Sequence, residues 1–167
     1  MSKTFSAFLY REQVASFIVN AVLNGGFAWW LTHGEMLALW HGEGAMGPDL
    51  LATSLLLAYL LSLAVAWITR RKYRQGKIPP FDQQCPPVLS ILPGGTARLA
   101  LAIGGIGLLI GGVLVTVMHG AGIEQMGREP YVLFKTFFAG TLAIICNYMT
   151  IVRTAHAVSQ ESFAVSG

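Results

Sequence analysis

The chain has 167 residues, of which 54% are hydrophobic and 11% are charged, and its formal net charge is +3. A soluble globular domain carries about 25% charged residues. The composition therefore excludes an ordinary soluble domain and favours a protein that keeps most of its surface in lipid.

Four apolar stretches predict four transmembrane helices. They cover residues 14–31, 50–69, 99–118 and 131–152, and the only charged residue in them is Lys135, near one end. About 20 helical residues cross the hydrocarbon core of a bilayer. We therefore predict an all-α integral membrane protein, a four-helix bundle with a single transmembrane domain. The alternative is a soluble protein with four core helices, but such helices would show a charged face.

The distribution of charge predicts the orientation of the bundle. Nine of the eleven Lys and Arg residues precede the first span, lie between the second and third, or follow the fourth. Cytoplasmic loops are enriched in Lys and Arg, so we predict that both termini and the loop 70–98 are cytoplasmic. The opposite face is acidic, with Glu35, Glu43, Asp49, Glu124 and Glu129. Topology and anionic lipid explain the basic loop better than nucleic acid does.

The two longer loops differ in character. The loop 70–98 begins with basic residues and then becomes rich in proline, which favours an irregular conformation. We interpret it as a hinge between two helical hairpins, and docking to a partner is the alternative. The outer segment 36–40 is apolar and flanked by glycines, which predicts a short helix at the membrane interface.

Polar side chains inside the spans form a candidate solute path. Asn20 and Asn24 stand four residues apart and share one face of the first span. Two further spans carry polar residues within seams of small side chains. The full set of candidates is Asn20, Asn24, Tyr59, Ser62, Asn147 and Thr150. These residues either contact a solute or hold the helices together by interhelical hydrogen bonds.

Glycines in the third and fourth spans predict close helix packing. Gly104, Gly107 and Gly111 recur at spacings typical of one helical face, and Gly140 lies in the small-residue seam of the fourth span. Small residues let two membrane helices approach closely. We therefore predict that these four glycines lie at helix–helix contacts.

Histidines and carboxylates gather on the predicted outer face. The motif His-Gly-Glu occurs twice in one loop, and another histidine lies at the outer end of the third span. Imidazole and carboxylate are suitable ligands for zinc or a similar divalent ion. The candidate metal ligands are His33, Glu35, His41, Glu43 and His119. The alternative is a solvated acidic surface without metal.

The motifs of several common enzyme classes are missing from the sequence. It contains no phosphate-binding Gly-x-x-x-x-Gly-Lys-Ser/Thr loop, no Gly-x-Ser-x-Gly nucleophile and no His-Glu-x-x-His pair. No carboxylate lies in the middle of a predicted span, which disfavours a proton-coupled antiporter. Cys85 and Cys146 form no Cys-x-x-Cys pair, and we expect no disulfide. We therefore expect neither an enzyme nor a cofactor.

One stretch of the first span carries a family resemblance. Residues 17–30 read Phe-x-x-Asn-x-x-x-Asn-Gly-Gly-x-Ala-Trp-Trp, and Leu92-Pro93 and Arg98 precede a Gly-rich span. The chain resembles a group of small uncharacterised four-span bacterial inner-membrane proteins often labelled as permeases. This resemblance implies a multi-pass protein of the bacterial inner membrane, and it carries over no catalytic or binding residues.

The sequence leaves two functions open. The first is a small permease or channel-like protein that handles a small solute. A four-helix bundle is thin, so this function implies a homo-oligomer. The second is a non-catalytic accessory or assembly subunit, whose small-residue faces dock onto a larger membrane complex. In both functions the protein contacts the bilayer and either further copies of itself or a larger membrane complex. Neither function involves nucleic acid.

Overall fold

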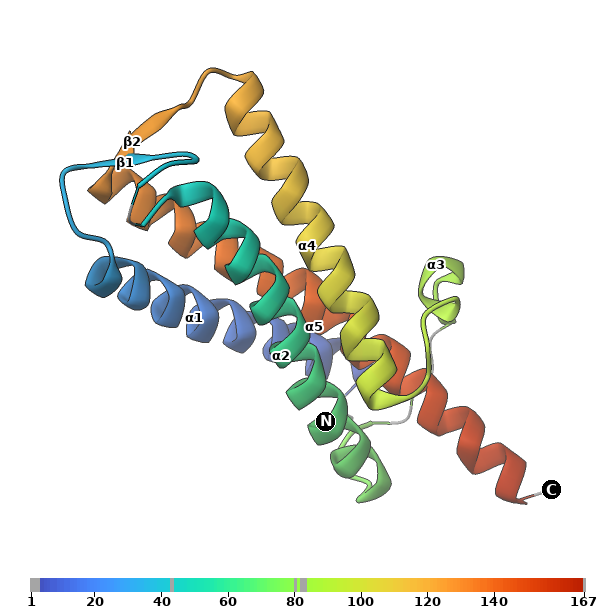
Figure 1. Cartoon of the computed structure of the whole chain (residues 1–167). Coiled ribbons are helices and arrows are strands. Elements are labelled where there is room, and N and C mark those ends of the chain that lie inside the picture. Colours follow the sequence, from blue (N-terminus) through green and yellow to red (C-terminus); the bar gives the residue numbers. More distant parts are fainter. Residues whose placement is uncertain (1–3, 43, 80, 82–83, 167) are drawn as a thin grey trace.

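Four long helices form the protein in the computed structural model, which describes residues 4–42, 44–79, 81 and 84–166 (Figure 1). The long helices are α1 (Phe5–Leu31), α2 (Met46–Arg74), α4 (Thr96–Gly120) and α5 (Arg128–Ser166). Each contains a window long and apolar enough to cross a membrane. The predicted all-α, four-helix membrane bundle is therefore confirmed.

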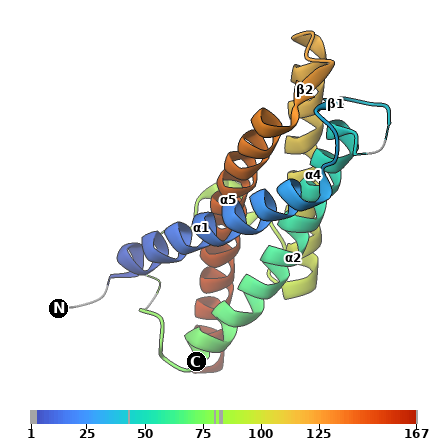
Figure 2. The ribbon, with the colours of Figure 1, turned by 90° about the vertical axis from the view of Figure 1, so that its left-hand side faces the viewer.

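Helix α5 lies at the centre of the bundle. It packs along α1 on one side and along α2 on another, while α2 also packs closely against α4 (Figures 1 and 2). Contact between α4 and α5 is slight. The bundle thus consists of two helix pairs, α1 with α5 and α2 with α4, joined mainly through the contact of α2 with α5.

Glycines permit the close contact between α2 and α4. A methyl group at Gly107 would overlap Ala58 Cβ and the Ser54 carbonyl oxygen, and one at Gly111 would overlap the Ser54 side chain. Gly104 lies against the Cβ of Tyr59. The backbones of α2 and α4 therefore approach more closely than a residue with a side chain larger than that of glycine would allow.

The contact between α1 and α5 depends on glycine in the same way. Gly140 of α5 lies under the ring of Phe17, and Gly25 of α1 lies against the side chain of Thr136. Each helix thus contributes one glycine, and each glycine receives a side chain of the other helix. Gly25 belongs to the packing surface although the sequence analysis assigned it no role.

A small sheet closes one end of the bundle. Strand β1 (Met36–Ala38) pairs antiparallel with β2 (Gln125–Gly127), so the loops after α1 and α4 are joined (Figure 1). We call this end of the bundle the sheet end. Backbone hydrogen bonds continue the pairing beyond the strands, from Leu39 N to Glu124 O at 2.8 Å and from Arg128 N to Glu35 O at 3.0 Å.

The predicted interfacial helix over residues 36–40 is wrong. Leu37 and Leu39 are 2% and 1% exposed, whereas Met36 and Trp40 are 58% and 45% exposed. This alternation has the period of a strand rather than a helix. Gly34 and Gly42, both with φ of 94°, flank the segment and turn the chain where a helix would have to continue.

The opposite end, which we call the basic end, holds the start of α1, the segment between α2 and α4, and the end of α5. The segment is irregular apart from the single turn α3 (Pro87–Ser90). Ile78 and Leu89 are buried in a cluster with residues of α1 and α5. Arg153 Nε of α5 donates to Leu92 O at 2.7 Å. The described part of this segment therefore packs onto the helix ends.

We predict that Gly107→Ala destabilises the protein by about 1 to 3 kcal/mol, because the added methyl group overpacks the contact between α2 and α4. Gly105→Ala is the matched control, since a methyl group there meets open space. It should leave stability unchanged or slightly higher, because alanine favours helix over glycine. Thermal unfolding in detergent measures both, and equal stability of the two variants would contradict the packing described here.

Candidate functional site

A groove between α1 and α2 brings polar side chains of three helices together. Its volume is about 580 Å³, and α5 adds one residue, Lys135, to the walls formed by α1 and α2. Its polar lining residues are Asn20, Asn24, Asp49, Thr53 and Lys135. The apolar part of the lining includes Phe27, Leu56 and Leu60, which are 55%, 54% and 56% exposed. The groove therefore opens sideways, toward the surface that faces lipid.

An ion pair forms the polar centre of the groove. Lys135 Nζ lies 2.7 Å from Asp49 Oδ1 and 2.5 Å from Asp49 Oδ2. The Tyr131 hydroxyl donates a hydrogen bond to the same carboxylate. Tyr131 and Lys135 stand one helical turn apart on α5, so one face of that helix presents both donors. Asp49 lies in the first turn of α2, where the helix dipole stabilises a negative charge.

Burial of this ion pair is uneven. Lys135 is 5% exposed and Tyr131 is fully buried, whereas the Asp49 side chain is 36% exposed. The ammonium group is therefore enclosed by protein. The carboxylate is the charged group of this pair that remains accessible from the groove.

Lys135 lies well below the end of α1, although Asp49 stands in the first turn of α2. Thr136, the neighbour of Lys135, contacts Gly25 of α1, and α1 continues to Leu31. The rise of an α-helix puts this level roughly 9 Å below the end of α1. An isolated charge at such a depth is costly in a membrane, and an oppositely charged partner with further hydrogen bonds offsets that cost.

The sequence analysis placed Asp49 in an outer loop, and the structure differs. Helix α2 begins at Met46, so Asp49 belongs to the helix and its side chain reaches α5. Lys135, as the one charge within a predicted span, was the available signal that a buried carboxylate was needed. Two carboxylates of the predicted outer face, Asp49 and Glu129, flank predicted spans, and only the packing of α2 on α5 selects Asp49.

Asn20 and Asn24 both line the groove, as their common helix face predicts. Asn20 Nδ2 donates to Ser16 O at 2.8 Å, and Asn24 Nδ2 donates to Asn20 O at 2.9 Å. Both amides therefore satisfy one donor on their own helix. In the described part of the chain, neither side chain forms a hydrogen bond to another helix. The two asparagines therefore differ from residues that hold helices together by interhelical hydrogen bonds.

The other four polar candidates lie away from the groove. Thr150 Oγ1 of α5 donates to Ser62 Oγ of α2 at 3.0 Å, and both residues are fully buried. Asn147 Nδ2 of α5 donates to Glu12 O of α1 at 3.1 Å. Tyr59 packs on Gly104. These contacts join helices, so the structure brings Asn20 and Asn24 together and separates the remaining candidates from them.

The metal-ligand candidates lie at the sheet end. Among the described residues, no three His, Cys, Asp or Glu side chains gather as a metal site would require. Glu35 is in the turn before β1 and uses its backbone carbonyl to bond Arg128. The His119 ring contacts the Trp40 ring edge-on, and His41 follows Trp40 in an exposed turn. His33 is exposed, and Glu43 lies outside the described residues.

Both cysteines are free. Cys85 belongs to the segment at the basic end, where burial raises the pKa of its thiol while the Arg153 charge opposes that shift. A thiol with a raised pKa stays protonated at neutral pH and is a poor nucleophile.

Comparisons of the chain with protein-family models, with curated proteins and with solved structures find no match. The resemblance to permease-labelled inner-membrane proteins therefore stays a prediction. The assignment of the candidate site consequently relies on the geometry of the groove.

We predict that Lys135→Met destabilises the protein by about 2 kcal/mol, because it leaves Asp49 without its charged partner, and the partial exposure of Asp49 moderates the loss. Lys135→Met combined with Asp49→Leu should recover most of that stability, since it removes both charges together. Chemical unfolding in mixed micelles measures the stability of the unmodified protein, of Lys135→Met and of the double variant. A double variant less stable than Lys135→Met would show that the pair is not coupled.

Proposed function

We propose that this is a permease-like membrane protein that passes a small polar solute along the groove between α1 and α2. The carrying observation is the Lys135–Asp49 ion pair, which shares the groove with Asn20 and Asn24. Helix association does not need the two asparagines, because Ser62, Thr150 and Asn147 join the helices elsewhere. Polar side chains exposed to a groove that faces lipid are better explained by contact with a solute than by helix packing.

The chemistry of the groove favours a neutral solute that donates hydrogen bonds. Lys135 and Asp49 neutralise each other, so the groove attracts neither cations nor anions strongly. The amide nitrogens of Asn20 and Asn24 already donate to their own helix. Their carbonyl oxygens and the exposed part of the Asp49 carboxylate supply acceptors for hydroxyl or amide groups of a solute.

A second copy of the chain completes the proposed path. The groove opens sideways, so a solute inside it would touch lipid unless another helix covers the opening. A homo-oligomer with the groove at its interface supplies that cover. Symmetric pairing is the commonest arrangement of identical subunits in soluble oligomers.

The proposal includes the location and orientation of the protein. Of the Lys and Arg residues that the structure describes, eight lie toward the basic end and two, Arg128 and Lys135, lie toward the sheet end. The positive-inside rule assigns that end to the cytoplasm, with both termini there and the sheet end outside. A bacterial inner membrane is the location that the family resemblance implies.

An accessory or assembly subunit is the second candidate. The observation that favours it is α1, whose most apolar window is 17% buried, against 39% for α5. A helix that packs against α5 on one side and leaves its other sides exposed suits docking onto another membrane protein. In that case the ion pair would only fix helix positions and would contact no solute.

We predict that native mass spectrometry of the protein, gently extracted from its own host, detects a homo-oligomer without other chains. A homo-oligomer follows from the need to cover the groove. A different protein present in stoichiometric amount would favour the accessory function and contradict the permease proposal.

We predict that Asn20→Leu/Asn24→Leu lowers the flux of neutral solutes at least about tenfold, the effect of losing roughly 1.4 kcal/mol of polar contact. Liposome swelling with glycerol and urea as probes measures the flux. Val19→Leu/Val22→Leu is the matched control, since both valines are exposed on the same helix. Loss of the asparagine variant from the membrane, with the control retained, would instead assign the asparagines to packing.

A further inference from the structure

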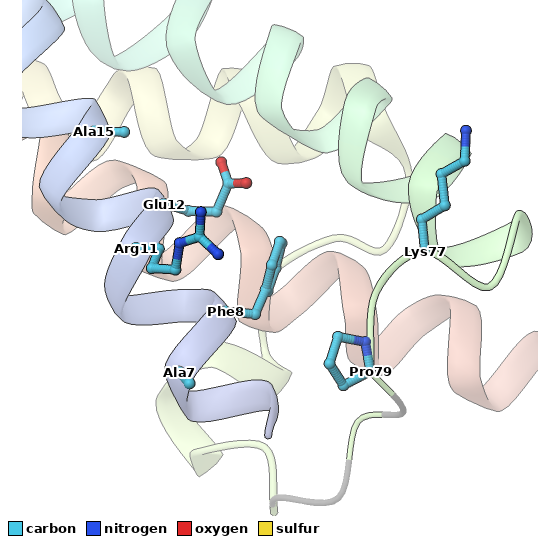
Figure 3. A pocket seen from close by; sticks show the side chains of 7 residues that line it. All are labelled: Ala7, Phe8, Arg11, Glu12, Ala15, Lys77 and Pro79. Carbon is cyan, nitrogen blue, oxygen red and sulfur yellow. The ribbon is translucent and has the colours of Figure 1, made fainter. Parts of the chain in front are cut away.

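A second cavity lies at the basic end, between the first turns of α1 and the chain that follows α2. Its volume is about 360 Å³, which lies within the range of small ligand sites. Figure 3 shows Arg11 and Phe8 of α1 on one side and Lys77 and Pro79 on the other. The cavity is distinct from the groove of the proposed permease and shares no lining residue with it.

Two cations of the cavity lining have no ion-pair partner in the described part of the chain. Its one described carboxylate, Glu12, lies 3.3 Å from Lys72 Nζ of α2 and is therefore neutralised. Arg11 and Lys77 are both exposed, and within the described part of the chain neither has an ion-pair partner. Among the described residues, the lining thus includes two cations without an ion-pair partner, and cations of this kind suit a phosphate group.

An apolar surface continues from the cavity along α1. Phe8 and Pro79 supply apolar lining beside the two cations. Val14, Ile18 and Val22 follow Arg11 on the same stripe of α1 and are 41%, 54% and 67% exposed. A ligand with its anionic group at Arg11 can therefore extend a hydrocarbon chain along α1 into the membrane.

We propose that this cavity binds the headgroup of an anionic phospholipid, with its phosphate between Arg11 and Lys77 and an acyl chain along α1. Free phosphate would use the two cations but would leave the apolar stripe without a role. Basic pockets at the ends of membrane helices are suited to such headgroups. A bound lipid would also support α1, which packs closely against α5 but has a smaller buried share than the other long helices.

Native mass spectrometry of the purified protein, titrated with phosphatidylglycerol or phosphatidylcholine, tests this proposal. Lys77→Gln should weaken phosphatidylglycerol binding about fivefold, and Arg11→Gln/Lys77→Gln roughly 25-fold, because each cation near a lipid surface contributes about the same energy. The control Arg71→Gln/Arg98→Gln removes two exposed cations of the basic end that do not line the cavity. It should change binding less than about twofold.

Three results would overturn the proposal. The first is an equal loss of phosphatidylglycerol binding in the cavity variants and the control, which would mean general attraction to a basic surface. The second is equal binding of phosphatidylcholine by the unmodified protein. The third is displacement of the lipid by millimolar inorganic phosphate, which would mean a free-anion site. Lys77→Gln changes an exposed loop residue, so it provides a folded variant if the double variant does not fold.

Discussion

Helices in a bilayer gain little by burying apolar side chains, because lipid is as apolar as the protein interior. Their association depends on how closely two backbones can approach. Here the close approaches occur at Gly107 and Gly111 between α2 and α4, and at Gly25 and Gly140 between α1 and α5. These contacts create two tightly packed helix pairs. The groove exists because α1 and α2 each pack on α5 and not closely on each other.

The ion pair follows from this arrangement. Once α2 lies along α5, Lys135 is enclosed and needs a counter-charge, which Asp49 supplies together with Tyr131. A register shift of α2 along α5 would separate Lys135 from Asp49 and leave a buried charge unpaired, at high cost. The pair therefore fixes the position of α2 on α5. It also places a partly exposed carboxylate beside Asn20 and Asn24, so one interaction determines both the helix register and the polarity of the groove.

The two ends of the bundle are held by different means. At the sheet end, the strands join the loops after α1 and α4, and Arg128 links α5 to α1. Its Nη2 donates to Trp29 O at 2.6 Å, and its guanidinium lies 4.4 Å from the centre of the Trp29 ring. At the basic end, buried side chains of the proline-rich segment pack between α1 and α5. Both ends thus hold α1 against α5 and limit how far the groove can open.

The sequence by itself determined the class of protein, because helix length and hydropathy respond to the bilayer whatever the helices pack against. It also identified Gly104, Gly107, Gly111 and Gly140 as packing residues, since small side chains at helical spacing have one main use in lipid. Only the tertiary structure decided which polar residues meet. Asn20 and Asn24 share a groove with Asp49 and Lys135, whereas Ser62 and Thr150 bond each other, because helix register and rotation depend on contacts between distant segments. The same dependence made Met36–Ala38 a strand, whose partner lies in the loop after α4.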